Sequence, residues 1–346
     1  MKKWIATTAL SLTLVTVAVN NSQALAEETT SQIGTLTQVE GTVKLFTHPS
    51  KALQKNDSPS PQVLFEGEYF RAQDAKVGDK VDLGNIVRTA PTAKARVIFD
   101  NGDQFNVGAG TAYRVSWSPE HPNAGTNISL MYGKFRGVIE KGGPRSKLKI
   151  RTRTATMGVR GTDFFIADEG DKGTEVSIIR GSVEVKPEAP QAKPVEVKAG
   201  YSVDVAPPAP VPAKSTTAEN TPPPAVQPAI ELRKTTQEDL TAIQKSSKIQ
   251  PKKDEVAPPP EVQAKLAVLE KKAVETTLGD IKKHDPKLYA QLQAQPQLTS
   301  TDDINAHAVA EIAKTAPKAP EKHKPYKSEM DDLENNAYEQ YFKNVE

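Results

Sequence analysis

The stretch from Ile33 to about Val205 alternates polar and apolar residues in short runs. Turn-forming residues separate these runs at intervals of about 8–12 residues. The runs lie at 41–46, 95–99, 104–107, 135–139, 148–153, 176–179, 183–185 and 195–197. A period of two is typical of β-strands with one buried face. We therefore expect residues 30–205 to form an all-β domain, either a β-sandwich or a short β-solenoid-like fold.

The clearest turn signal is the pair Asn101 and Gly102, which lies between the apolar runs 95–99 and 104–107. Asn-Gly favours a two-residue hairpin loop, because both residues tolerate the positive φ that a type I′ turn requires. We expect a structural turn here with Asn101 and Gly102 at its tip.

The pattern changes after Val205. Twelve of the 55 residues from 206 to 260 are proline, which predicts a semi-extended Pro-rich linker. One short helix, from Thr235 to Ser246, is expected inside it. Residues 261–346 show helical spacing but contain few large apolar side chains. They predict a partly ordered α-helical tail, or one that packs on a partner.

The N-terminal segment has the features of an export signal. Lys2 and Lys3 precede the charge-free apolar stretch Trp4–Val19, and Ala24-Leu25-Ala26 supplies the small residues of a cleavage site. We expect Met1–Ala26 to be a signal peptide, and the mature protein to be periplasmic or secreted without a transmembrane segment. The alternative is a retained membrane anchor, but a span needs about 20 apolar residues and this stretch is shorter.

Composition narrows the possible chemistry. The chain has no cysteine, which excludes disulfides and thiolate metal sites. Its net charge of +2 is too small to indicate a nucleic-acid partner. No two of its five histidines share a metal-ligand spacing, and it lacks a nucleophile elbow, a phosphate-binding loop and a dinucleotide fingerprint. We expect a protein that is not an enzyme and has no cofactor or metal site.

Several stretches resemble the FecR domain of bacterial envelope proteins, over about residues 77–205. They are Gly78–Val81 with Val87–Thr89, Ala95–Gly102, Arg153–Phe164 and Arg180–Val185. The most specific is Arg153–Phe164, which is close to the family signature Thr-Ala-x-x-Gly-Val-Arg-Gly-Thr-Asp-Phe.

The best-known members of that family relay a signal from an outer-membrane iron-transport receptor to a sigma factor, through a cytoplasmic segment and one membrane span. This chain begins with a predicted signal peptide instead. The resemblance therefore implies a non-catalytic periplasmic module for binding, scaffolding or signal sensing, whose partner is an envelope protein or an anionic envelope polymer. The alternatives are an anti-sigma-type regulator of iron-transport signalling and an envelope glycan-binding protein.

Within the signature, Gly158 and Gly161 bracket Arg160 and are candidates for tight backbone bends. Asp163 could accept hydrogen bonds from nearby backbone N–H groups or pair with Arg160. Two interpretations remain open. The motif is a structural corner of the fold, or Arg160 and Asp163 contact a ligand or partner.

A second candidate contact surface consists of four cations at alternate positions, with Leu148 and Ile150 between them. They are Lys147, Lys149, Arg151 and Arg153. A period of two puts all four on one face of a strand, which we call the basic face. This face could attract an anionic partner. The alternative is an ordinary solvated sheet face.

Overall fold

The computed structural model describes residues 34–53, 60–116, 126–145, 147–189, 192–207, 230–250, 257–294 and 300–318. The predicted signal peptide, Met1–Ala26, lies outside these residues. So do residues 208–229, which are most of the Pro-rich part of the predicted linker.

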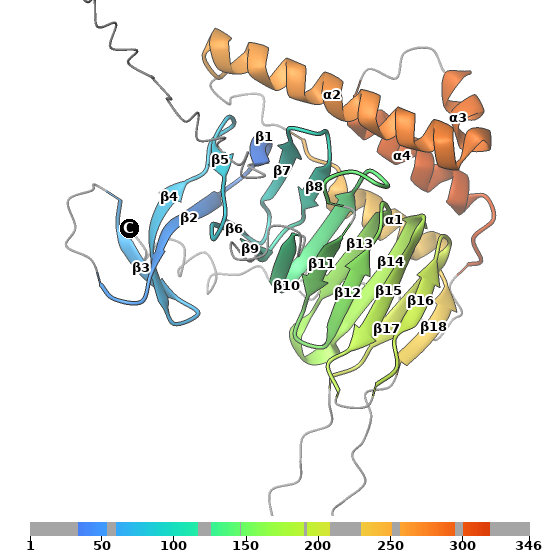
Figure 1. Ribbon diagram of the computed structural model, residues 1–346, viewed down its shortest axis with the longest axis horizontal. Coiled ribbons are helices and arrows are strands. Elements are labelled where there is room, and N and C mark those ends of the chain that lie inside the picture. Colours follow the sequence, from blue (N-terminus) through green and yellow to red (C-terminus); the bar gives the residue numbers. More distant parts are fainter. Residues whose placement is uncertain are drawn as a thin grey trace, which may run out of the picture. The chain divides into compact units, whose positions relative to one another are not determined.

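Two β-sheets form the body of the domain (Figure 1). We call the first the helix-covered sheet, and all its neighbouring strands are antiparallel. In spatial order it contains β5 (Lys80–Val81), β1 (Gly34–Glu40), β7 (Lys94–Phe99), β8 (Gln104–Val107), β10 (Asn127–Val138), β13 (Asp163–Asp168), β14 (Thr174–Arg180), β17 (Tyr201–Val205) and β18 (Ile230–Lys234). A short 3-10 helix, η2 (Gly170–Lys172), connects β13 to β14.

The second sheet is antiparallel except for the parallel pair of β10 and β11. In spatial order it contains β3 (Gln62–Phe65), β4 (Glu68–Asp74), β2 (Val43–Ser50), β6 (Ile86–Thr89), β9 (Ala112–Ser116), β10, β11 (Leu148–Arg151), β12 (Ala155–Val159), β15 (Ser182–Pro187) and β16 (Val195–Lys198).

Strand β10 belongs to both sheets. Its first half pairs with β9, and its second half, from Gly133 onward, pairs with β13. Gly133 has φ +98°, and a Cβ atom there would collide with Thr111 and with the carbonyl oxygen of Gly110, so glycine allows the chain to cross at this point. The predicted all-β domain is confirmed, and its form is a sandwich.

The inward residues of the two sheets share one core. Phe105, Phe135 and Phe164 come from the helix-covered sheet, while Tyr113 and Met157 come from the second sheet. The rings of Phe105 and Phe135 lie 4.7 Å apart between centroids. Burial of this apolar surface, at about 25 cal/mol per Å², is the main stabilising contribution in a chain without disulfides.

The predicted hairpin at Asn101 and Gly102 is present, but its turn differs from the expected type. Gly102 has φ +93°, whereas Asn101 is not in the positive-φ region. The Gly102 N–H donates to the Phe99 carbonyl at 2.8 Å, and the Phe99 N–H donates to the Asp103 carbonyl at 3.0 Å. The loop therefore contains three residues, with glycine at its left-handed position, and is not a type I′ turn.

The chain returns to the helix-covered sheet after the Pro-rich stretch. Strand β18 lies within the predicted linker and pairs with β17, with Leu232 opposite Val203. Helix α1 (Gln237–Ser247) follows, and Thr236 and Asp239 form a capping box at its start. The predicted short helix is confirmed. Proline content alone did not reveal that a strand precedes it.

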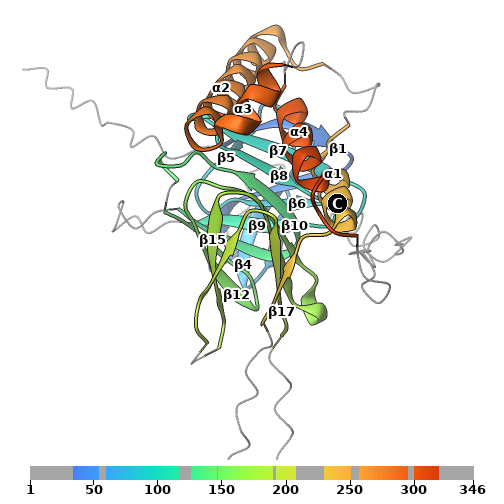
Figure 2. The same cartoon turned by 90° about the vertical axis from the view of Figure 1, so that its right-hand side faces the viewer.

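The described helices of the predicted C-terminal tail pack on the β domain. They are α2 (Pro260–His284), α3 (Pro286–Gln293) and α4 (Thr301–Ala313), and Figure 2 shows them beside α1 on one side of the sandwich. Phe165, Ala167 and Ile179 on the outer side of β13 and β14 share a hydrophobic cluster with them. Because β13 is buried on both faces, its apolar run supplies the surface that these sparsely apolar helices need.

Within the described part of the chain, none of the helices has the length and apolar character that a membrane span requires.

Candidate functional site

The basic face lies on the outer side of the second sheet. In β11, Leu148 and Ile150 point into the core, while Lys149 and Arg151 are exposed. Lys147 and Arg153, on either side of the strand, are exposed too. Lys149 and Arg151 therefore reach solvent from the same side of β11. Lys147 and Arg153 flank the strand, and Arg153 lies beside Asp168 at the end of β13.

The surroundings leave the basic face open. The glycine opposite Lys149 on β12 is Gly158, where a Cβ atom would meet nothing within 4 Å. Arg151 lies 3.4 Å from Glu188 and Arg153 lies 3.9 Å from Asp168, both between Nε and a carboxylate oxygen. Among the described residues, Lys147 and Lys149 have no ion-pair partner. The face therefore keeps an excess of positive charge.

Acidic side chains continue the same surface on the next strands. Across the sheet, Lys149 is followed by Gly158, then by Glu184 on β15 and Glu196 on β16. Both glutamates are exposed. The outer side of this part of the sheet thus carries cations on β11 and both signs of charge on β15 and β16, where Lys186 and Lys198 are exposed beside the glutamates.

The structure pairs the signature aspartate Asp163 with Arg136 of β10. Asp163 Oδ1 accepts from Arg136 Nε and Oδ2 accepts from Nη2, both at 2.8 Å. Both residues are 2 % exposed. Asp163 is therefore inaccessible to a ligand and does not pair with Arg160, which is exposed.

The two signature glycines have different environments. Gly161 has φ +70°, and a Cβ atom there would overlap the backbone of Lys141. Gly158 lies inside β12 without a positive φ and faces open space. Gly161 thus occupies a backbone corner, whereas Gly158 leaves room beside Lys149.

A layer of buried polar side chains lies between the helix-covered sheet and the helices. Arg96 on β7 is fully buried and pairs with Asp302 of α4, with Nη1 3.2 Å from Oδ2. Arg180 on β14 pairs with Asp280 of α2. Two arginines of the sheet therefore take their carboxylate partners from the C-terminal helices, which fixes where these helices dock.

Uncharged side chains extend the same layer. Gln104 of β8 donates to Thr277 of α2 at 3.1 Å and accepts from Asn305 of α4 at 3.4 Å. Arg136 donates from Nη2 to the Asn305 carbonyl at 3.3 Å. These residues were not identified from the sequence. The available signal was a charged or amide side chain within an apolar run of a central strand, which requires a buried partner.

A second charged cluster joins β18 and α1 to the sandwich. Arg233 of β18 lies 2.9 Å from a carboxylate oxygen of Glu175 on β14, 2.9 Å from one of Asp204 on β17, and also pairs with Asp239 of α1. The pKa of Glu175 is raised to about 7, chiefly by burial and also by the charges of Asp204 and Asp239, against the opposing effects of Arg233 and of the hydrogen bond from Ser177. Burial lowers the pKa of Arg233, but Glu175 and Asp204 outweigh this, so that pKa is raised overall.

Among the described residues, no group of three or more His, Cys, Asp or Glu side chains has the arrangement of a metal site. The clusters described above pair each buried charge with a fixed opposite charge or with a hydrogen-bond donor. These clusters position structural elements. The exposed cationic surface lies on the opposite side of the sandwich.

Residues 85–184 match the family model described as FecR protein. The resemblance seen in the sequence is confirmed over this segment, which matches a FecR domain. The matched segment includes the signature, Arg96, Arg136, Arg180 and the whole basic face.

Two solved structures are similar to the chain, both of a “putative anti-sigma factor” from Parabacteroides distasonis ATCC 8503. They share 18 % and 17 % identity with it, each at a TM-score of 0.34. The alignments cover 45 % of this chain and 62 % and 63 % of the other chains, so less than two-thirds of their length is spanned. The search of curated proteins gave no match.

Proposed function

We propose that this protein is a non-catalytic, exported binding module of the bacterial envelope that takes part in signalling. Its basic face, formed by Lys147, Lys149, Arg151 and Arg153, binds an acidic segment of an envelope protein. The observation that carries the proposal is the exposure of all four cations on and beside β11, within the segment that matches the FecR model.

The charge pattern around the basic face favours a protein partner over an anionic polymer. Glu184 and Glu196 stand on the same side of the sheet as Lys149. With the exposed Lys186 and Lys198 beside them, the sheet presents both signs of charge, which complements a protein surface of mixed charge better than a uniformly anionic glycan. Complementary charges mainly increase the rate of encounter and the specificity of such a contact.

The test is capture of the partner from crosslinked envelope extracts. The parent is compared with a variant in which all four cations of the basic face are changed to glutamine. A matched control changes the exposed Lys265, Lys271, Lys272 and Lys283 of α2 to glutamine, which removes the same charge elsewhere. We expect the parent and the control to capture the same protein, with less capture as salt rises.

The basic-face variant should stay folded, because Leu148 and Ile150 are unchanged, and it should lose that capture. Equal capture by all three proteins would contradict the proposal and favour a solvated face. Salt-sensitive retention on purified peptidoglycan, lost only in the basic-face variant, would favour the envelope glycan-binding alternative instead. Export is tested separately by mass spectrometry, where we expect a mature N-terminus at Glu27 and where an intact Met1 would contradict export.

A further inference from the structure

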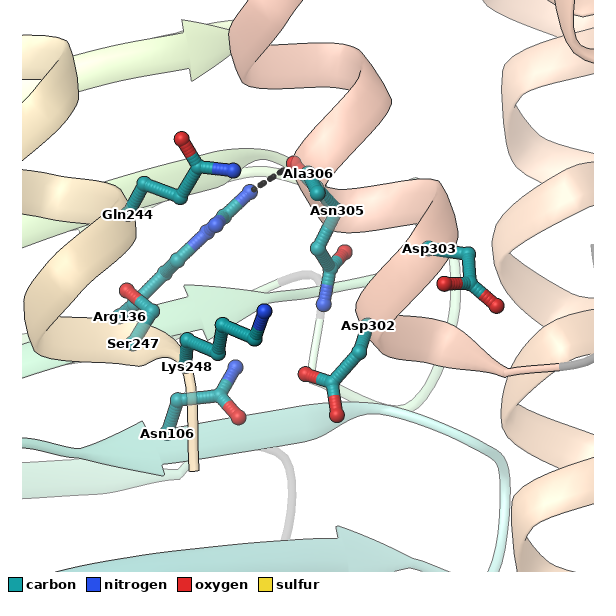
Figure 3. Close-up of a pocket in the computed structure, with 9 residues that line it drawn as sticks. All are labelled: Asn106, Arg136, Gln244, Ser247, Lys248, Asp302, Asp303, Asn305 and Ala306. Atoms are coloured by element: carbon teal, nitrogen blue, oxygen red, sulfur yellow. Dashed lines mark hydrogen bonds between the residues drawn. The ribbon is translucent and has the colours of Figure 1, made fainter. Parts of the chain in front are cut away.

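A small polar pocket lies where α1, α4 and the helix-covered sheet meet. Its cavity volume is about 80 Å³, which exceeds the space that a single water molecule needs. The side chains drawn in Figure 3 line it: Asn106, Arg136, Gln244, Ser247, Lys248, Asp302, Asp303, Asn305 and Ala306. The pocket is separate from the proposed partner-binding surface, because the basic face is on the opposite sheet.

The pocket contains a buried donor that lacks an acceptor. Asn106 is 2 % exposed, and its Oδ1 accepts from Arg96 Nε at 2.7 Å. This bond fixes the orientation of the amide, and its Nδ2 then has no hydrogen-bond partner among the described residues. A buried donor left unsatisfied costs about 1–3 kcal/mol, so an acceptor is expected in the pocket.

The pocket also contains a cation without a counter-ion. Arg136 is neutralised by Asp163, and both oxygens of Asp302 are held by Arg96. Asp303 accepts from the Ser300 hydroxyl at 2.8 Å and points away from the other side chains in Figure 3. Lys248 is exposed at the mouth of the pocket, points into the space between Arg136, Asn305 and Asp302, and forms no ion pair with any described residue.

We propose that this pocket binds a small monocarboxylate, with one oxygen accepting from Lys248 Nζ and the other from Asn106 Nδ2. The single unpaired positive charge matches a monoanion. A phosphate dianion is disfavoured because the Asp302 carboxylate forms part of the wall. Since Asn106 belongs to β8, Lys248 follows α1 and Asp302 belongs to α4, the bound carboxylate would tie the helices to the sheet.

Thermal unfolding of the purified protein tests the site, with sodium acetate and sodium lactate as probes. Sodium chloride and sodium phosphate at equal ionic strength are the comparisons. At ten times the dissociation constant, acetate or lactate should raise the Tm by roughly 3 °C relative to chloride. Phosphate should give no larger rise than chloride.

Two variants remove the proposed donors, and a third is the control. Lys248→Gln removes the ammonium group. Asn106→Asp removes the amide donor but keeps an acceptor for Arg96. Both should lower the apparent affinity for acetate at least tenfold in isothermal titration calorimetry. Lys245→Gln, with the same charge change on α1 outside the pocket lining, should bind as the parent does.

Equal shifts with acetate and chloride, or acetate binding that survives in Lys248→Gln, would overturn the proposal and leave ordered water as the partner of Asn106. A larger shift with phosphate would overturn the choice of a monoanion. Trialanine with a free C-terminus, compared with its C-terminal amide, distinguishes the source. If trialanine stabilises the protein and its amide does not, the pocket can bind a peptide C-terminus. If only acetate and lactate stabilise it, the ligand is a free small acid.

Discussion

Asp163 of the FecR signature forms a two-point ion pair with Arg136, each of its oxygens 2.8 Å from a guanidinium nitrogen. The pair joins β13 to β10 in the middle of the helix-covered sheet, opposite the C-terminal helices. Arg136 also donates to the carbonyl of Asn305 in α4. Asp163 thus orients Arg136, which in turn forms a hydrogen bond to helix α4.

Asp163→Asn should be strongly destabilising, because it leaves the Arg136 charge buried without a counter-ion. Loss of one partner of a buried pair costs about 3–5 kcal/mol. Urea unfolding measures the change, with Arg160→Ala as a control expected within about 0.5 kcal/mol of the parent. Similar losses for both variants would show that the exposed arginine also supports the fold.

Gly161→Val should destabilise the β domain, whereas Gly158→Ala should not. A β-branched residue at φ +70° is strained by about 1–3 kcal/mol, and its Cβ would overlap the backbone of Lys141 as well. An added Cβ at Gly158 meets nothing within 4 Å. The check is the Tm of the two variants, and equal values would mean that Gly161 does not occupy a backbone corner.

Glu175 should make stability depend on pH near neutrality. Its pKa rises from an ordinary value of 4.5 to about 7 in the folded protein, chiefly through burial. Between these values the folded state keeps a proton that the unfolded state has lost, so the free energy of unfolding falls as pH rises. The loss should be roughly 1–3 kcal/mol between pH 4.5 and pH 8.

The measurement is urea unfolding of the parent and of Glu175→Gln across this range. The variant should lack the decline, while Glu196→Gln, an exposed control, should retain it. A constant difference between parent and Glu175→Gln at all pH values would contradict the raised pKa.

A fragment that ends at Val205 should be less stable than one that ends at residue 318. Removal of β18 and the helices uncovers Phe165 and Ile179, and it leaves Arg96 and Arg180 without their carboxylates. The pattern of strands alone placed the end of the domain at Val205. Equal melting temperatures for the two fragments would support that boundary.

Local sequence was sufficient for features that depend on near neighbours. Alternation placed Leu148 and Ile150 inward and Lys149 and Arg151 outward, because one side of β11 remains in water. The hairpin at Gly102 followed from its turn residues, and the start of helix α1 depends on the neighbouring Thr236 and Asp239. The signature was also sufficient to identify a FecR domain, which the match over residues 85–184 confirms for that segment.

Only the tertiary structure decided which distant groups meet. Asp163 pairs with a residue 27 positions earlier, not with Arg160 three positions before it, because β13 lies beside β10 in the sheet. The C-terminal helices pack on the same chain, because β13 is apolar on both of its faces. A period-two pattern predicts a strand with one apolar face, so it does not reveal the second face that these helices cover. The pKa of Glu175 depends on charges from β17, β18 and α1, which folding brings together from separate parts of the chain. Strand order and burial determine these contacts, and neither can be read from the spacing of residues along the sequence.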